Sequence, residues 1–345
     1  ALGSFLGLDP SVVGPTGQVS QVALAITNPN VGILYVLAVT SVGVYGITLA
    51  GWSSNNKWSL LGGIRASAQM ISYEITLSLA IVGVLLLSGS LNLYDIIGAQ
   101  SGTSAAEGGF WNWNVIAQPV GFLMFIIAMF AETNRLPFDL AEAEPELTGG
   151  FHTEYSSMRF AMFFMGEYVN MAVVSAMCAT LFLGGFHGPI SMHVLVDGGW
   201  EGLAEAMGSL GWIAILGMYL AGPTIILPAK VAGFIFLFIF IRGVFPRMRY
   251  DQLMSLGWKR LLPIGLINIF ITTIVVAVDL GMRAGADTGQ EGMSVLAKWI
   301  CGAITLSLFL AWDILFLSPR RRKQLEREYR LMPREKESSQ PALAS

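Results

Sequence analysis

The chain has 345 residues, of which 54% are hydrophobic and only 12% are charged, and its formal net charge is -3. Soluble domains carry about 25% charged residues, so this chain has too little polar surface to cover a water-soluble body of its size. Its two cysteines, Cys178 and Cys301, are too few for an iron–sulfur cluster or a disulfide framework. The composition predicts an all-α polytopic transmembrane helical bundle.

Seven apolar runs approach the length needed to cross a bilayer, which is about 20 residues. They cover Val31–Trp52, Ala66–Leu87, Val115–Ala131, Phe160–Leu183, Thr224–Phe245, Leu261–Leu280 and Val295–Leu317. The stretch Leu210–Tyr219 is apolar but short, and Gly222 and Pro223 separate it from the fifth run. Because proline and glycine break helices, we expect this stretch to form a separate interfacial helix.

Basic residues indicate the orientation, because Lys and Arg gather in cytoplasmic loops. Of the 20 basic residues, 17 lie in alternate connections or in the C-terminal tail. The exceptions are Lys230, Arg283 and Lys298. The pattern predicts an outer loop over residues 1–30, a transmembrane domain over 31–317, and a basic cytoplasmic tail over 318–345.

The cytoplasmic connection 132–158 carries a dense acidic cluster that orientation does not require, since acidic residues contribute little to topology. Glu142, Glu144 and Glu146 are spaced by two and cannot share one helix face. A loop that gathers them would raise some of their pKa values and let them carry protons near neutral pH. The alternatives are a solvated acidic loop, or metal binding by carboxylates without a recognisable spacing.

Two carboxylates lie inside expected spans: Glu74 and Glu167 each stand about two turns into a helix. Burying such a charge costs roughly 2.5–3.5 kcal/mol, which marks either a proton path or a structural ion pair. The helix of Glu74 carries three further polar side chains on one face: Arg65, Gln69 and Tyr73. Lys230 in the fifth span is expected either to snorkel outward or to pair with a buried carboxylate.

The acidic segment AETNRLPFDLAEAEPEL (residues 131–147), together with GFHTEY (150–155) and FFMGEY (163–168), closely resembles the H-subunit family of respiratory complex I, the proton-pumping NADH:quinone oxidoreductase. Three further stretches agree with that family: NVGILY with GWSSNNK (30–35 and 51–57), RASAQMISYE (65–74) and RGVFPRMRYDQLM (242–254). The resemblance runs from about Asn30 to Leu280.

The resemblance implies a membrane subunit that forms part of a quinone chamber and an acidic path coupling quinone reduction to proton translocation. It implies no redox centre in this subunit, quinone as the substrate, and partners in the peripheral arm and among the antiporter-like subunits, in a bacterial cytoplasmic membrane. No nucleic-acid partner is expected. The acidic path would comprise Glu74, Glu132, Glu142, Glu144, Glu146, Glu154 and Glu167. The chamber would comprise Arg135, Phe138, Asp139 and Tyr155, with Arg65, Tyr73 and Lys230 in secondary positions.

The sequence departs from that family at both ends. The two N-terminal helices and the amphipathic quinone-entry segment are missing, so we expect Ala1 to be the start of an observed fragment and Val12–Gly17 to be outer loop. The seventh span resembles an extra helix of some bacterial members. Two alternatives stay open: the homologous subunit of a membrane-bound hydrogenase or another donor-linked dehydrogenase, and a stand-alone ion transporter, which would show inverted repeats.

Overall fold

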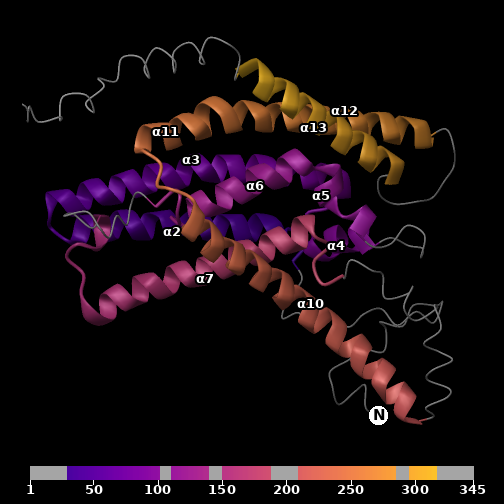
Figure 1. Cartoon of the computed structure of the whole chain (residues 1–345), viewed down its shortest axis with the longest axis horizontal. Coiled ribbons are helices and arrows are strands. Elements are labelled where there is room, and N and C mark those ends of the chain that lie inside the picture. Colours follow the sequence, from indigo (N-terminus) through magenta and orange to yellow (C-terminus); the bar gives the residue numbers. More distant parts are fainter. Residues whose placement is uncertain (1–28, 102–109, 140–149, 188–208, 285–294, 317–345) are drawn as a thin grey trace, which may run out of the picture.

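A computed structural model describes residues 29–101, 110–139, 150–187, 209–284 and 295–316 of the chain. All regular elements within these ranges are helices, arranged as a layered bundle (Figure 1). Five of the helices are long and apolar enough to cross a membrane, and two shorter apolar helices match the third and seventh expected spans. The structure therefore confirms the predicted all-α membrane fold.

The central helix is α3 (Lys57–Ser88), which follows α2 (Gly32–Ser53) after a short turn. The side chain of Asn56 caps its N-terminus by accepting a hydrogen bond of 3.0 Å from the backbone N–H of Trp58. Since α3 begins nine residues before the expected Ala66, Glu74 lies near its middle rather than two turns from its start. The charge is therefore set deeper along the helix than the sequence pattern predicted.

Small residues allow α2 and α3 to approach closely. A Cβ atom at Gly63 would lie 3.3 Å from the Cα of Gly51, and one at Gly62 would lie 2.9 Å from the Cα of Gly150. The second contact presses the short 3₁₀ helix η3 (Gly150–His152) against α3. Close backbone approach of this kind is a common source of helix association in membranes.

The third expected span, Val115–Ala131, consists of two helices, α5 (Asn114–Ala117) and α6 (Pro119–Glu132). The break falls at Gln118, whose backbone is not helical. A residue before proline is disfavoured in the helical region, and Pro119 lacks the N–H that would continue the ladder. Short helices η2 (Phe110–Asn112) and α4 (Leu93–Ser101) precede this pair.

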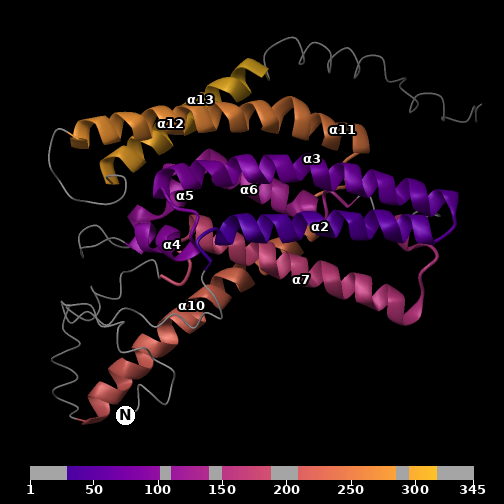
Figure 2. The same cartoon turned by 180° about the vertical axis from the view of Figure 1, so that it is seen from behind.

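Two helices, α7 (Ser157–Phe182) and α10 (Ser209–Val244), pack against each other, and α10 runs obliquely away from the bundle (Figures 1 and 2). The expectation of a separate interfacial helix over Leu210–Tyr219 is wrong, because α10 is continuous through Gly222 and Pro223. A proline removes one hydrogen bond of the ladder, and membrane helices tolerate such an interruption where neighbouring groups satisfy the freed carbonyl.

The remaining helical layer follows the bend after α10. Helix α11 (Tyr250–Leu256) leads through a π-helical turn, η5 (Gly257–Leu261), into α12 (Leu262–Ala284). Helix α13 (Val295–Phe316) contacts α12, α5 and α6. Together α12 and α13 cover the side of α3 and α6 that faces away from α7 (Figures 1 and 2).

Within the part of the chain that the structure describes, Lys230 makes neither of the two interactions expected from the sequence. Its ammonium group donates to the carbonyls of Leu183, Gly185 and His187, at 2.5, 2.8 and 2.6 Å, and lies 4.5 Å from the centre of the Trp113 ring. These carbonyls follow the C-terminus of α7, where the helix dipole favours a cation. The prediction of outward snorkelling or a carboxylate partner is therefore corrected: Lys230 caps a helix.

Lys298 on α13 has the same kind of environment, because its ammonium group lies against the C-terminal end of α4. It is only 4% exposed, and its ammonium group donates to the side chain of Asn112 at 2.6 Å and to the carbonyl of Ala99 at 3.1 Å. Two of the three exceptions in the basic-residue pattern are thus held by backbone and amide oxygens. These hydrogen bonds explain how two lysines can lie on the side of the membrane where the chain otherwise carries few basic residues.

Candidate functional site

Glu74 on α3 and Glu132 at the end of α6 face one cavity of about 320 Å³ between α2, α3 and α6. Glu132 is 4% exposed and Glu74 is half-buried. Within the described ranges, Oε1 of Glu74 and Oε2 of Glu132 are buried without a hydrogen-bond partner. The remainder of the cavity wall is apolar or carries hydroxyls: Leu37, Thr40, Ser41, Ile75, Leu77, Ser78, Leu79 and Val82.

The two carboxyl groups in this cavity interact electrostatically. Like charges in a low-dielectric cavity repel far more strongly than in water. Placing two negative charges here is therefore costly, and a proton that the two groups share removes that cost. The geometry provides two proton-accepting groups on different helices. The hydroxyl of Ser41 lines the same cavity and donates to the carbonyl of Leu37 at 3.0 Å.

The segment Thr133–Asp139 continues from α6 and is folded tightly against α3. The carboxamide nitrogen of Gln69 donates its two hydrogens to the carbonyls of Ala131 and Phe138, both at 2.9 Å, and shares one of them with the side-chain oxygen of Asn134 at 3.2 Å. Asn134 adopts a left-handed backbone with φ of 49°, which asparagine tolerates better than most residues. One amide thus holds both ends of the segment.

Two ion pairs fix the outer side of the same segment. Arg135 lies 3.5 Å from Glu167 on α7 and stacks 4.6 Å from the centre of the Tyr168 ring. Asp139 pairs with Arg247 at 3.0 Å, which joins the segment to the connection between α10 and α11. The contact of Glu167 fits the structural-pair alternative raised for it, and its part in a proton path stays a prediction.

Two aromatic residues of the predicted site, Tyr73 and Phe138, lie beside each other near the junction of α3 and α11. The hydroxyl of Tyr73 donates to the carbonyl of Leu253 at 3.0 Å, and its ring lies 5.8 Å from that of Phe138. The guanidinium of Arg65 lies over the Tyr250 ring at 5.1 Å. The spacing that placed Arg65 and Tyr73 on one face of α3 therefore corresponds to two contacts with the same neighbouring helix.

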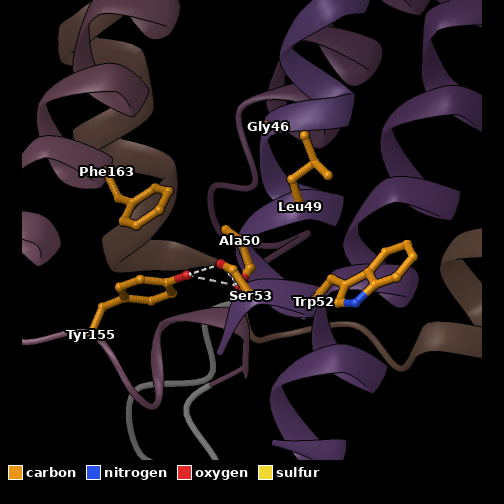
Figure 3. Close-up of a pocket in the computed structure, with 7 residues that line it drawn as sticks. All are labelled: Gly46, Leu49, Ala50, Trp52, Ser53, Tyr155 and Phe163. Carbon is orange, nitrogen blue, oxygen red and sulfur yellow. Dashed lines mark hydrogen bonds between the residues drawn. The ribbon is translucent and has the colours of Figure 1, made fainter. Parts of the chain in front are cut away.

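Tyr155 lines a second pocket of about 570 Å³ between α2 and the start of α7 (Figure 3). Its hydroxyl donates to the carbonyl of Ala50 at 2.8 Å and lies 2.6 Å from the hydroxyl of Ser53. The other lining residues are mainly apolar: Gly46, Leu49, Trp52 and Phe163. A mainly apolar pocket with two adjacent fixed hydroxyls, those of Tyr155 and Ser53, suits a hydrophobic ligand.

The structure does not bring all the predicted acidic residues together. Glu154 is exposed and accepts a hydrogen bond of 2.7 Å from Asn56 at the turn between α2 and α3, apart from the cavity of Glu74. Glu142, Glu144 and Glu146 lie outside the described residues. Gln69 was placed on the polar face of α3 from the sequence, but without a role in the site. The available signal was an amide in an apolar span, which requires partners when buried.

Comparisons with known proteins agree with this arrangement. The profile of the NADH dehydrogenase family matches residues 6–273. An H-type subunit of the NADH-quinone oxidoreductase of Koribacter versatilis is 46% identical over 269 residues, which cover 77% of this chain and 67% of the relative. NADH-quinone oxidoreductase subunit 8 of Rhodothermus marinus is 50% identical over 255 residues, covering 74% and 70%. The H-type subunit of Salinibacter ruber is 46% identical over 255 residues, covering 74% and 69%.

The family match spans both membrane carboxylates and the buried segment between α6 and α7, and the identity extends over most of the chain. The chain therefore belongs to the NADH dehydrogenase family.

Proposed function

We propose that this chain is the H-type membrane subunit of a proton-pumping NADH:quinone oxidoreductase. It forms part of the quinone chamber and an acidic path that couples quinone reduction to proton translocation. The observation that carries the proposal is the cavity shared by Glu74 and Glu132, since intramembrane carboxylates that face a common space are typical of proton relays. The names of the relatives support the oxidoreductase assignment.

The chamber and the acidic path meet at the segment Thr133–Asp139. Phe138 and Asp139 form its chamber side, and Glu132 adjoins it at the end of α6. A change of charge where quinone is reduced would act on Arg135 and Asp139 first, and then on Glu132 through the rigid segment. Moving one charge against 100 mV costs about 2.3 kcal/mol, so the carboxylates must change their proton affinity by a comparable amount.

The proposed quinone ligand has its own support in the pocket of Tyr155. The walls are apolar, the volume is about 570 Å³, and a tyrosine hydroxyl is held at one side (Figure 3). Such a pocket suits the hydrophobic part of a quinone better than a charged ligand. No electron carrier is assigned to this subunit, and the electrons would come from partner subunits.

The proposed partners are the peripheral-arm subunits of the quinone site and the antiporter-like subunits of the membrane arm. The proposed location is the bacterial cytoplasmic membrane, with the C-terminus inside, because the basic residues concentrate on that side. Neither the hydrogenase-type alternative nor the stand-alone transporter is favoured, since the matched relatives are named as subunits of NADH-quinone oxidoreductases.

The test is Glu74→Gln in the assembled oxidoreductase, reconstituted into sealed vesicles. The substitution keeps the shape of the side chain and removes its proton-accepting charge. We expect proton translocation per NADH oxidised to fall clearly, with quinone reduction slowed. Wild-type values for both quantities would refute the role of Glu74.

A matched control is Asp95→Asn. Asp95 is exposed on α4 and accepts a hydrogen bond from Ser90, away from the carboxylate cavity. It is also an acid-to-amide change, so it controls for altered charge in the protein. We expect wild-type coupling from this variant.

A further inference from the structure

We propose that Gln69 is a positioning residue that couples the quinone-chamber wall to the carboxylate cavity. The inference rests on the proposed function and adds a residue that carries no charge and touches neither carboxylate. The hydrogen-bond partners of Gln69 lie on both sides of the site. Gln69 is 1% exposed, and its carboxamide donates to the last turn of α6 at Ala131 and to the segment Thr133–Asp139 at Asn134 and Phe138.

The bond to the carbonyl of Ala131 determines the position of the last turn of α6. The next residue is Glu132, which lines the carboxylate cavity. A shift of that carbonyl therefore moves the Glu132 backbone as well. Through this bond, Gln69 sets how far Glu132 enters the space that it shares with Glu74.

The bond to the carbonyl of Phe138 acts at the opposite end of the segment. Phe138 is 6% exposed and packs beside Tyr73, and the next residue, Asp139, is paired with Arg247. The same carboxamide group therefore holds the chamber side and the cavity side at a set separation. When one end moves, the shared donor must either follow it or release the other end.

The segment has few other ways to satisfy these groups. It is buried, and a buried carbonyl without a partner is costly. Two of its other backbone bonds close the turn itself, from Arg135 N–H to the carbonyl of Phe130 and from Phe138 N–H to the carbonyl of Arg135. A third comes from the connection between α10 and α11, where Met248 N–H donates to the carbonyl of Pro137 at 3.1 Å. Gln69 is thus the α3 side chain that satisfies backbone carbonyls on both sides of this turn, while the Asn134 amide makes a weaker contact with the sulfur of Met70 at 4.0 Å. Since Glu74 lies five positions further along α3, the helix also links the anchor to the second carboxylate.

Of the two ion pairs on the outer side of the segment, one is looser than this anchor, and the other, between Asp139 and Arg247, is at 3.0 Å. Arg135 and Glu167 are 3.5 Å apart, which is longer than a well-formed charge-assisted hydrogen bond. A change of charge in the chamber can therefore alter this pair more readily than the bonds of Gln69. The segment is expected to pivot about Gln69 when that happens, which would carry the displacement to Glu132.

The main variant is Gln69→Leu, which keeps the size of the side chain and removes its donors. The matched control is Gln100→Leu. Gln100 is also fully buried and holds backbone groups of two neighbouring segments, including the carbonyl of Thr180 and the N–H of Gly184, but it touches neither pocket. Both variants lose a buried amide, so a purely structural effect should appear in both.

The assay uses the assembled oxidoreductase in sealed vesicles and measures quinone KM, kcat and protons moved per NADH. For Gln69→Leu we expect a raised quinone KM, with kcat/KM lowered by up to about 100-fold as for a misplaced positioning group, and a lower proton ratio. For Gln100→Leu we expect both quantities to stay at wild-type values in the complex that assembles. If the two variants behave alike, or if Gln69→Leu keeps a wild-type KM and proton ratio, the inference is wrong.

Two further variants keep the result decisive. If Gln69→Leu does not assemble, Gln69→Asn is measured instead, because its shorter amide can reach only part of the segment. It should give an intermediate proton ratio, and wild-type coupling from it would overturn the inference. Glu74→Gln in the same vesicles separates the two proposals. A loss of coupling with Glu74→Gln but not with the Gln69 variants refutes only the role of Gln69, whereas wild-type coupling with Glu74→Gln refutes the proposed function.

Discussion

Replacing Lys230 by Met tests the distinction between a helix cap and a proton carrier. The ammonium group donates to three carbonyls beyond the end of α7, and methionine fills a similar volume without a donor. A hydrogen bond to a charged group contributes about 1.5–3 kcal/mol, and an orphaned buried carbonyl costs about 1–3 kcal/mol. These values are not additive, and the side chain is only partly buried.

The loss of these hydrogen bonds destabilises the variant, and part of that loss is offset because the ammonium no longer has to be desolvated. We expect a net decrease of about 3 kcal/mol in the free energy of unfolding, or roughly a hundredfold in the unfolding equilibrium. The assay is the fraction of intact complex that survives a heating series in detergent, read by size-exclusion chromatography. Lys259→Met is the control, since Lys259 is exposed on the π-helical turn. The complex that survives should translocate protons at the wild-type ratio.

Two outcomes would refute the reasoning about Lys230. Wild-type thermal stability of Lys230→Met would show that the three carbonyls do not depend on the ammonium group. A stable complex with a lowered proton ratio would instead place Lys230 in the proton path, in place of the capping role that its contacts indicate.

Two further predictions concern the second pocket and the contact between α13 and α5. Tyr155→Phe removes the hydroxyl bonded to Ala50, so it should cost about 1 kcal/mol of stability and raise the quinone KM; an unchanged KM in a titration of quinone would exclude this pocket from the chamber. Gly302→Ala places a Cβ against the carbonyl oxygen of Ile116 with no room between them, so overpacking should destabilise the protein by roughly 1–3 kcal/mol in the heating series. Gly43→Ala, where a Cβ meets nothing within 4 Å, should behave as wild type, and equal stability of both variants would contradict the steric argument.

The membrane fold was predictable because each span is a local property of the chain. A membrane helix satisfies its backbone hydrogen bonds internally, so the hydropathy of one segment is enough to identify it. The exact limits were less predictable. The stretch Lys57–Arg65 carries a charge at each end, and its place in α3 accompanies the close approach of α2 and η3 at Gly62 and Gly63. The continuity of α10 through Pro223 likewise depends on surroundings that no local pattern contains.

The acidic motif was recognisable in the sequence because its order of charged and apolar residues is specific, and it identified Glu132 as a candidate. Glu74 was identified separately, as a carboxylate inside an apolar span. The sequence could show that a buried polar side chain needs a partner, but not which one. Only the tertiary structure decided that Lys230 caps α7, that Arg135 meets Glu167, and that Gln69 holds both ends of one segment. These partners are far apart in the chain, and their selection depends on how helices cross in three dimensions, which is set by the packing of the whole bundle.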